Sequence, residues 1–274
     1  MIKVSTFGEV TRFDMCRGIF RRGVYWTTAY LVDGLMVDTG CAHTSWDLLN
    51  CLDEKEIKQI VNTHCHEDHI GGNAPLQESN PGADTYAHPS ALPIIRDPVN
   101  NQPLHFYRKF VWGMPRPSLV QPIEDGSLVK TDKFSFLVIN TPGHTPDHLC
   151  LYEPERKWIF TGDLFVGGKD RAIRAGSDIW QIIESLKLIA SLPLKGMYPS
   201  SARVRNEPLE TLKEKIDYLE LTGESVLELA GRGWEEDKIS REIFGKKMWI
   251  ELITGGHLSR RNLVRSYLRS TPRC

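Results

Sequence analysis

The sequence lacks two features that would assign it to a broad class at once. It has no basic excess, because 34 lysine and arginine residues stand against 35 aspartate and glutamate residues, for a formal net charge of −1. Proteins that bind nucleic acids usually carry a clear basic excess. No segment approaches the roughly 20 consecutive apolar residues that a membrane-spanning helix needs. We therefore expect neither a nucleic-acid partner nor a membrane partner.

Signals of export and of a disulfide framework are also missing. The opening stretch MIKVSTFGEVTRFD has neither the basic nor the apolar region of a signal peptide. The six cysteines are scattered and form no CxxC pair; they are Cys16, Cys41, Cys51, Cys65, Cys150 and Cys274. In a chain of this length without an export signal, we expect reduced thiols and a cytoplasmic location.

What is present is the ordinary composition of a globular protein of 274 residues, with 41% hydrophobic and 25% charged residues. Two apolar stretches joined through Asp33-Gly34 predict a hairpin. Apolar spacing predicts a helix in SDIWQIIESLKLIASL. Residues 96–122 have no clean period and are either a loosely packed connector or a lid over a pocket.

The character of the chain changes near residue 207. From there, Leu209, Leu212, Ile216 and Leu219 recur with helical spacing. The pattern predicts a mixed α/β domain over residues 1–206 and a helical region over residues 207–274. The apolar helices of that region either pair in a homodimer or cover the pocket, and the sequence leaves both alternatives open.

The stretch THCHEDHIGG crowds four potential metal ligands into six residues: His64, His66, Asp68 and His69. Neutral imidazole and carboxylate are natural ligands of zinc and similar divalent ions. Crowding three imidazoles and a carboxylate without a cation would leave polar groups competing for partners. Two further candidates follow apolar strands, His144 in INTPGHTPDH and Asp163 in WIFTGDLF.

The motifs THCHEDHIGG, TPGHT and FTGDLF, in this order, resemble those of the metallo-β-lactamase superfamily over about residues 20–200. The resemblance implies an αββα four-layer sandwich and a divalent metal centre with one or two ions per chain. Zinc is favoured, with iron or manganese as alternatives. It also implies the ligands: His64, His66 and His144 for the first ion, Asp68 and His69 for the second, and Asp163 as the bridge.

One position departs from that pattern. Members of the superfamily usually supply another histidine after the long helix, where this chain reads MYPSSARV with Ser200 and Ser201. Three alternatives stay open: a weak or empty second site, completion by water or Ser201, or His257 folding back as the missing ligand. Serine hydroxyl is a poor zinc ligand, so the second ion should bind more weakly in each case.

The C-terminal helical region resembles the one that covers the pocket in the glyoxalase-II-like branch of the superfamily. The segment GGHLSRRNL looks like the corresponding element of a quinolone-signalling thioesterase in that branch. This resemblance implies that His257, and with it Arg260, faces the substrate. Asp38 and His148 are candidates for hydrogen bonds that orient the ligands.

The function expected from these observations is hydrolysis of a small ester or thioester. A bound divalent ion lowers the pKa of water from 15.7 to about 7, so a metal-bound hydroxide is available as nucleophile at neutral pH. Asp68 would orient that hydroxide, and His257 would act at the substrate. The alternatives are a non-catalytic, ligand-binding pseudo-enzyme of the same fold, a phosphodiesterase, and a relative that uses iron for redox or oxygen chemistry.

Overall fold

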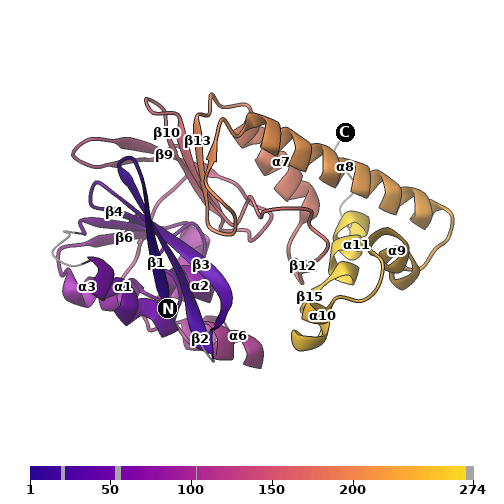
Figure 1. Ribbon diagram of the computed structural model, residues 1–274, viewed down its shortest axis with the longest axis horizontal. Helices are drawn as coiled ribbons and strands as arrows, with labels where there is room; N and C mark the ends of the chain where they lie inside the picture. The colour runs from indigo at the N-terminus through magenta and orange to yellow at the C-terminus, as the bar shows by residue number, and fades with distance from the viewer. Residues whose placement is uncertain (20–21, 53–56, 103, 270–274) are drawn as a thin grey trace.

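Two β-sheets packed face to face, with helices on their outer faces, form the body of the protein (Figure 1). The computed structural model describes residues 1–19, 22–52, 57–102 and 104–269. Helices α1 (Ser45–Leu52) and α3 (Asn73–Ser79) cover the first sheet, and α7 (Ile179–Ala190) and α8 (Leu209–Gly231) cover the second. This arrangement confirms the predicted αββα sandwich with C-terminal helices.

The first sheet contains the N-terminal strands in chain order. They are β1 (Ile2–Phe7), β2 (Val10–Ile19), β3 (Arg22–Val32), β4 (Leu35–Val37), β5 (Gln59–Val61), β6 (Asp84–Ala87) and β7 (Gln121–Pro122). Asp33 and Gly34, at φ 47° and 79°, turn β3 back into β4. Two successive positive φ angles are typical of a tight hairpin turn, so the predicted hairpin is confirmed. From β4 onward the strands run parallel.

The second sheet has the order β14-β13-β11-β10-β9-β8 among the described residues. Its strands are β8 (Leu128–Lys130), β9 (Ser135–Asn140), β10 (Leu149–Glu153), β11 (Trp158–Gly162), β13 (Gly196–Pro199) and β14 (Arg205–Asn206). Strands β10 and β11 pair antiparallel as a hairpin. Between the two sheets, Tyr30 packs edge-on against Phe160 and Tyr198 at centroid distances of 5.4 and 5.7 Å.

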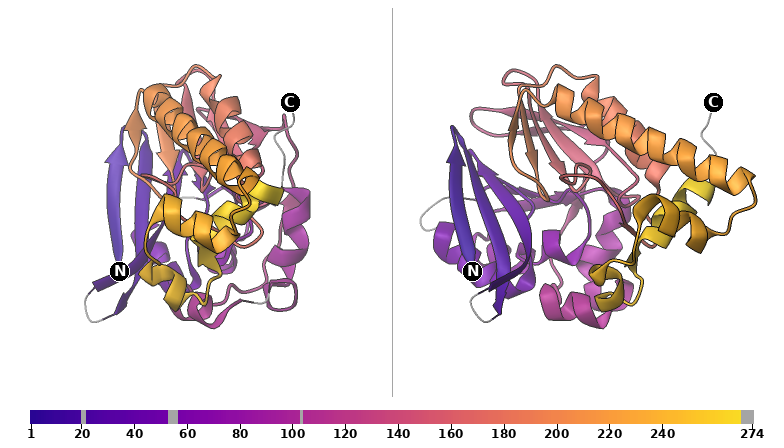
Figure 2. Two further views of the ribbon diagram at one scale, coloured as in Figure 1. Left: turned by 90° about the vertical axis from the view of Figure 1, so that its right-hand side faces the viewer. Right: turned by 45° about the vertical axis from the view of Figure 1, so that its right-hand side comes forward.

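The C-terminal helices continue from this body. Beyond α8 they are α9 (Glu236–Phe244), α10 (Trp249–Ile253) and α11 (Arg260–Arg269), which gather beside the sandwich (Figures 1 and 2). Leu212, Ile216 and Leu219 of α8 are buried as their spacing predicts, whereas Leu209 is 41% exposed at the helix start. The core that α7 builds includes residues of α8, so the division at residues 206 and 207 stays a prediction.

A small two-stranded sheet joins the C-terminal region to the body. Strand β12 (Ile173–Arg174) pairs antiparallel with β15 (Leu258–Ser259). The sequence pattern predicted neither these strands nor α10, because two-residue strands and a five-residue helix are too short to establish a period.

Residues 96–122, for which the sequence left two alternatives, combine short helices with irregular segments. They follow η2 (Pro89–Ala91) and α4 (Leu92–Arg96) and include α5 (Pro98–Asn101) and α6 (Phe106–Val111). Arg108 of α6 forms a buried ion pair with Glu67, in the histidine-rich segment. Gln102 donates to the carbonyl of Cys65 at 3.1 Å. These contacts attach the segment to the candidate metal loop.

Two further predictions concern the membrane and the thiols. Among the described helices, none combines the length and the apolarity needed to cross a bilayer. Cys41, Cys65 and Cys150 are buried thiols outside any disulfide. Cys274 lies outside the described residues.

Candidate metal centre

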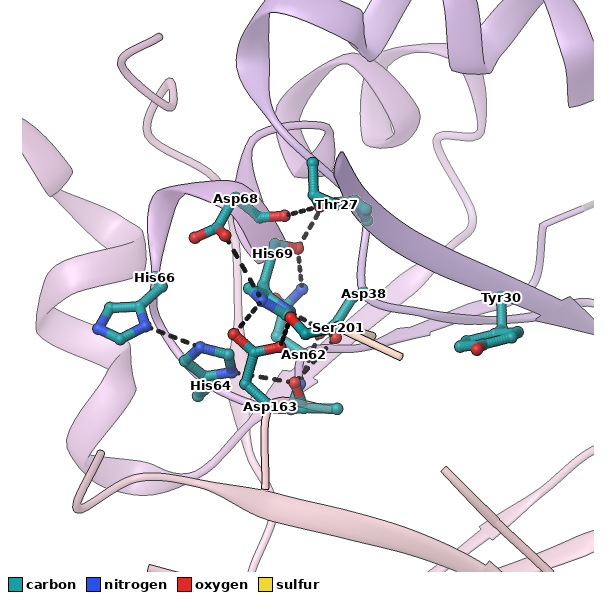
Figure 3. Close-up of polar contacts among 12 residues, drawn as sticks. Thr27, Tyr30, Asp38, Asn62, His64, His66, Asp68, His69, Asp163 and Ser201 are labelled. Carbon is teal, nitrogen blue, oxygen red and sulfur yellow. Dashed lines mark hydrogen bonds and ion pairs between the residues drawn. The ribbon is translucent and has the colours of Figure 1, made fainter. Parts of the chain in front are cut away.

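Loops at one edge of the sandwich carry all six predicted ligands. His64 and His66 follow β5, and the short helix α2 (Glu67–Ile70) continues directly from them and carries Asp68 and His69. His144 lies between β9 and β10, and Asp163 follows β11. Polar residues at strand ends thus converge from both sheets (Figure 3).

The first group of potential ligand atoms consists of three imidazole nitrogens. His64 Nε2 lies 2.9 Å from His66 Nδ1, and His144 Nε2 lies 3.1 Å from the same atom. These residues form a group whose ligand atoms all lie within 4.8 Å of one another. The structure therefore brings together rings from positions 64, 66 and 144.

The second group consists of His64, His69 and Asp163. His69 Nε2 lies 3.4 Å from Asp163 Oδ2, and His144 Nε2 lies 3.6 Å from the same oxygen. Asp163 thus faces both groups, as expected of a bridging carboxylate. Asp68 stands slightly apart, with Oδ2 3.9 Å from His69 Nε2.

Asp38 fixes the orientation of His69. Its carboxylate accepts hydrogen bonds from the Thr63 amide and hydroxyl at 2.7 and 2.8 Å, and its Oδ2 lies 2.8 Å from His69 Nδ1. When Nδ1 donates to Asp38, Nε2 is the atom that faces Asp163. Because the Thr63 hydroxyl donates to Asp38, its oxygen can accept from His64 Nδ1, 3.1 Å away, which leaves His64 Nε2 with a free lone pair.

Burial and neighbouring charges set the proton occupancy of the cluster. Burial, followed by the neighbouring imidazoles, holds the pKa of His64 well below its ordinary value. Burial also lowers the pKa of His66, and that of His144 to about 4. The three rings of the first group are therefore neutral at pH 7, which is the form that coordinates a metal.

His69 behaves differently. Burial opposes its charge, but Asp38 and Asp163 outweigh that effect and raise the pKa of His69 well above its ordinary value. Burial likewise opposes ionisation of Asp163, while the imidazoles of His69 and His144 lower the pKa of that carboxyl. Positive charge is thus favoured between these carboxylates, and a divalent cation would supply it.

Ser201 and His148, two residues that the sequence singled out, both form hydrogen bonds with Asp163. The hydroxyl of Ser201 donates to Asp163 Oδ1 at 2.7 Å, so the serine lies beside the bridging carboxylate. His148 Nε2 accepts from the Asp163 amide at 3.2 Å, so it holds the backbone at this ligand. Gly162 adopts φ +47°, and a Cβ there would lie 2.6 Å from Thr63 Oγ1.

His257 is not brought into either group of ligand atoms within the described part of the chain. Its Nδ1 lies 2.6 Å from the Tyr107 hydroxyl, and its ring lies 4.3 Å from that of His105. Arg260 donates to Glu251 at 2.6 Å and to the carbonyl of Gly245, so it joins α10 to α11. The catalytic role expected for His257 remains a prediction.

A cavity of about 540 Å³ opens beside the metal-ligand residues. His144, Asp163 and Ser201 line its polar end. Its apolar walls come from Trp112, from the segment around β12 and from α10. The volume lies within the range of about 300–1,000 Å³ that is usual for sites of small molecules.

The donor set fits a divalent cation. Three neutral imidazole nitrogens that meet at hydrogen-bond distance lack enough protons to satisfy one another, and one cation would satisfy all three. Asp68 Oδ1 is buried without a hydrogen-bond partner in the described structure, as expected of a carboxylate oxygen that a cation would neutralise.

Several residues around the cluster were absent from the sequence-based predictions. Thr63 supports Asp38, the Glu67–Arg108 pair fixes the loop, and Arg174 lies with its Nη2 3.9 Å from Asp68 Oδ1. Their contacts join positions 25 or more residues apart. A local pattern could have indicated only Thr63, which directly precedes the first ligand.

The chain is similar in sequence to several known proteins. A hydroxyacylglutathione hydrolase of Legionella pneumophila (strain Corby) is 31% identical over 138 residues, which cover 50% of this chain and 44% of the relative. The thioesterase pkgB of Emericella nidulans is 28% identical over 181 residues, covering 63% and 45%. The chain spans about half the length of the curated relatives it matches.

A solved structure shares the fold. The metallo-beta-lactamase family protein TTHA1429 from Thermus thermophilus superposes with a TM-score of 0.68 at 17% identity, covering 94% of this chain and 91% of its own. The family model of the metallo-beta-lactamase superfamily matches residues 23–201, well over half of the chain. The protein therefore belongs to the metallo-beta-lactamase superfamily.

Proposed function

We propose that the protein is a metal-dependent hydrolase of a small ester or thioester. The observation that carries this proposal is the meeting of three neutral imidazole nitrogens, from His64, His66 and His144, beside a cavity that His144 also lines. The thioesterase and hydroxyacylglutathione hydrolase among the relatives support the choice of thioester or ester over other substrates. The cavity volume supports a small-molecule substrate.

The roles follow from the contacts. His64, His66 and His144 would hold the first ion, Asp68 and His69 would hold a second, and Asp163 would face both. A bound divalent ion activates water and polarises the carbonyl of the substrate. Asp38 keeps His69 Nε2 directed at the centre, and residues of α6 and α10 form part of the cavity wall.

The direct test combines metal analysis with an activity panel. Protein reconstituted with zinc, iron or manganese should retain one or two ions per chain and hydrolyse members of a panel of esters, thioesters, lactones and phosphodiesters. His66→Ala should lose bound metal and at least about 100-fold of the activity, because a ligand is missing.

A matched control is available in the same sequence. His43 is exposed, with Nε2 3.2 Å from the carbonyl of Lys109, and it belongs to neither ligand group. His43→Ala should therefore keep both metal and activity. Wild-type protein that retains none of the three metals contradicts the proposal.

One observation favours a second candidate function. Ser201 stands where the superfamily usually has a histidine, and its hydroxyl donates to Asp163 rather than offering an imidazole nitrogen. A weakened centre of this kind fits a pseudo-enzyme that binds a ligand without turnover. Full metal content without activity on the whole panel would support this candidate over the hydrolase.

A further inference from the structure

Arg174 combines a buried position with a missing partner. Its side chain is 13% exposed and lines the cavity, and its Nη1 is buried without a hydrogen-bond partner in the described structure. A guanidinium carries its charge at all physiological pH values and can only donate hydrogen bonds. Leaving such a donor unsatisfied is costly, so an acceptor at this position would be stabilising.

Two distant segments hold the guanidinium in place. Arg174 pairs with Leu258 in the β12–β15 sheet, and the neighbouring Ala175 amide donates to the His257 carbonyl at 2.9 Å. On the other side, Arg174 Cζ lies 5.6 Å from the centre of the buried Trp112 ring. A cation over an indole face is attracted to it. The backbone of Arg174 is therefore held by strand pairing, and its guanidinium is placed by the Trp112 ring.

The only ion pair of Arg174 in the described residues is a long one. Its Nη2 lies 3.9 Å from Asp68 Oδ1, which is itself without a hydrogen bond. Asp68 is also a predicted metal ligand. A cation held by Asp68 would neutralise that carboxylate, and Arg174 would then lose the counter-charge of its ion-pair partner.

The other residues that line the cavity indicate the chemistry of the rest of the ligand. Much of its wall is apolar and comes from Leu164, Val166, Ile173, Trp249, Ile250 and Ile253. The charged residues Lys169, Asp170 and Arg171 also line it. Trp249 lines the cavity and is 75% exposed to solvent. Helix α10 therefore presents a large aromatic group at the cavity margin. A ligand that fits carries an oxygen acceptor at one end and an apolar body.

We propose that Arg174 binds the acyl carbonyl oxygen of an ester or thioester of an apolar carboxylic acid, and then the carboxylate that hydrolysis releases. This inference rests on the proposed hydrolase function. In the reaction, water adds to the acyl carbon and the bond to the ester oxygen or thioester sulfur breaks. The acyl part leaves as the carboxylate, the other part takes one proton of the water as an alcohol or thiol, and the second proton goes to solvent.

The test measures binding of the product class in metal-loaded protein. Isothermal titration with 4-phenylbutyrate and with its uncharged amide compares wild type with Arg174→Met, which keeps the apolar stem and removes the charge. The carboxylate should bind at least about tenfold more weakly to the variant, while the affinity for the amide changes far less. Arg174→Lys keeps the charge but loses the planar guanidinium. Its affinity for the carboxylate should lie between those of wild type and Arg174→Met.

Controls separate this inference from the function on which it rests. Arg116 is exposed and pairs with Glu78 away from the cavity, so Arg116→Met should bind the carboxylate like wild type. Metal content is measured for every variant, and Arg174→Gln replaces the methionine variant if that one does not fold.

Two results have distinct meanings. Wild type that holds metal and turns over the panel, but binds 4-phenylbutyrate no more tightly than Arg174→Met with equal metal content, overturns the role of Arg174 alone. Wild type without metal or turnover contradicts the proposed function instead.

Discussion

Asp38 is the position where a conservative change should affect both metal binding and folding, in a way that a matched control can separate. Its carboxylate accepts from the Thr63 amide and hydroxyl, and its Oδ2 lies 2.8 Å from His69 Nδ1. Asp38→Asn keeps the shape but replaces one acceptor oxygen with a donor and removes the negative charge. The new NH2 group either faces the Thr63 amide N–H, which is repulsive, or takes the place of Oδ2. In the second case the contacts with the Thr63 hydroxyl and His69 Nδ1 must break or reverse their donors.

The expected magnitude follows from those contacts. Loss of a partner that orients a ligand typically costs 10- to 100-fold in metal affinity, which is about 1.4–2.8 kcal/mol. A buried donor left unsatisfied lowers the free energy of unfolding by a further 1–3 kcal/mol or so. Asp38→Asn should therefore weaken both metal binding and the metal-free fold.

The assay is a competition titration of zinc against a chelator, together with urea unfolding of the metal-free protein. Asp14 provides a matched control, because its Oδ1 accepts from Arg12 at 2.8 Å and from Thr28 at 2.7 Å, away from the ligand groups. Asp14→Asn should lower stability without changing zinc affinity. If Asp38→Asn bound zinc as tightly as wild type, the orienting role of Asp38 would be refuted.

Three further outcomes are expected. Gly162→Ala should lower the free energy of unfolding by about 2–5 kcal/mol in urea titrations, because φ is +47° and the added Cβ would approach Thr63 Oγ1 to 2.6 Å; Gly82→Ala, where the Cβ meets nothing within 4 Å, should stay within about 0.5 kcal/mol of wild type. Arg108→Met should cost about 3–5 kcal/mol by the same assay, because it leaves the buried Glu67 unpaired, and adding Glu67→Gln should restore part of the loss. Removing the metal with a chelator should lower the melting temperature in calorimetry, since a ligand at 100 times its dissociation constant stabilises by about 2.7 kcal/mol; an unchanged melting temperature would argue against metal bound to the folded state.

The sequence identified the residues whose chemistry is local. His64, His66, Asp68 and His69 form one motif, and the structure places all four at the same edge because the loop after β5 leads directly into the short helix α2. His144 was identifiable because it follows an apolar strand with a sharp Pro-Gly turn.

What the sequence could not predict depends on distant contacts. The partner of Glu67 is 41 residues away, and nothing around Arg108 distinguishes it from a solvated arginine. Arg174 likewise lies in a two-residue strand whose direction is fixed by β15, more than 80 residues later. Leu209 shows a limit of local patterns. Periodicity predicts which face of a helix is apolar, but it does not predict at which residue the burial of that face begins.

Anomalous scattering from crystals of the zinc-reconstituted protein, measured on both sides of the zinc edge, would locate the ion itself. We expect a peak at about 2.0–2.1 Å from His64 Nε2, His66 Nδ1 and His144 Nε2. A protein that crystallises from zinc without a peak at these three nitrogens, or with its zinc bound elsewhere, would contradict the assignment of this cluster as a metal centre.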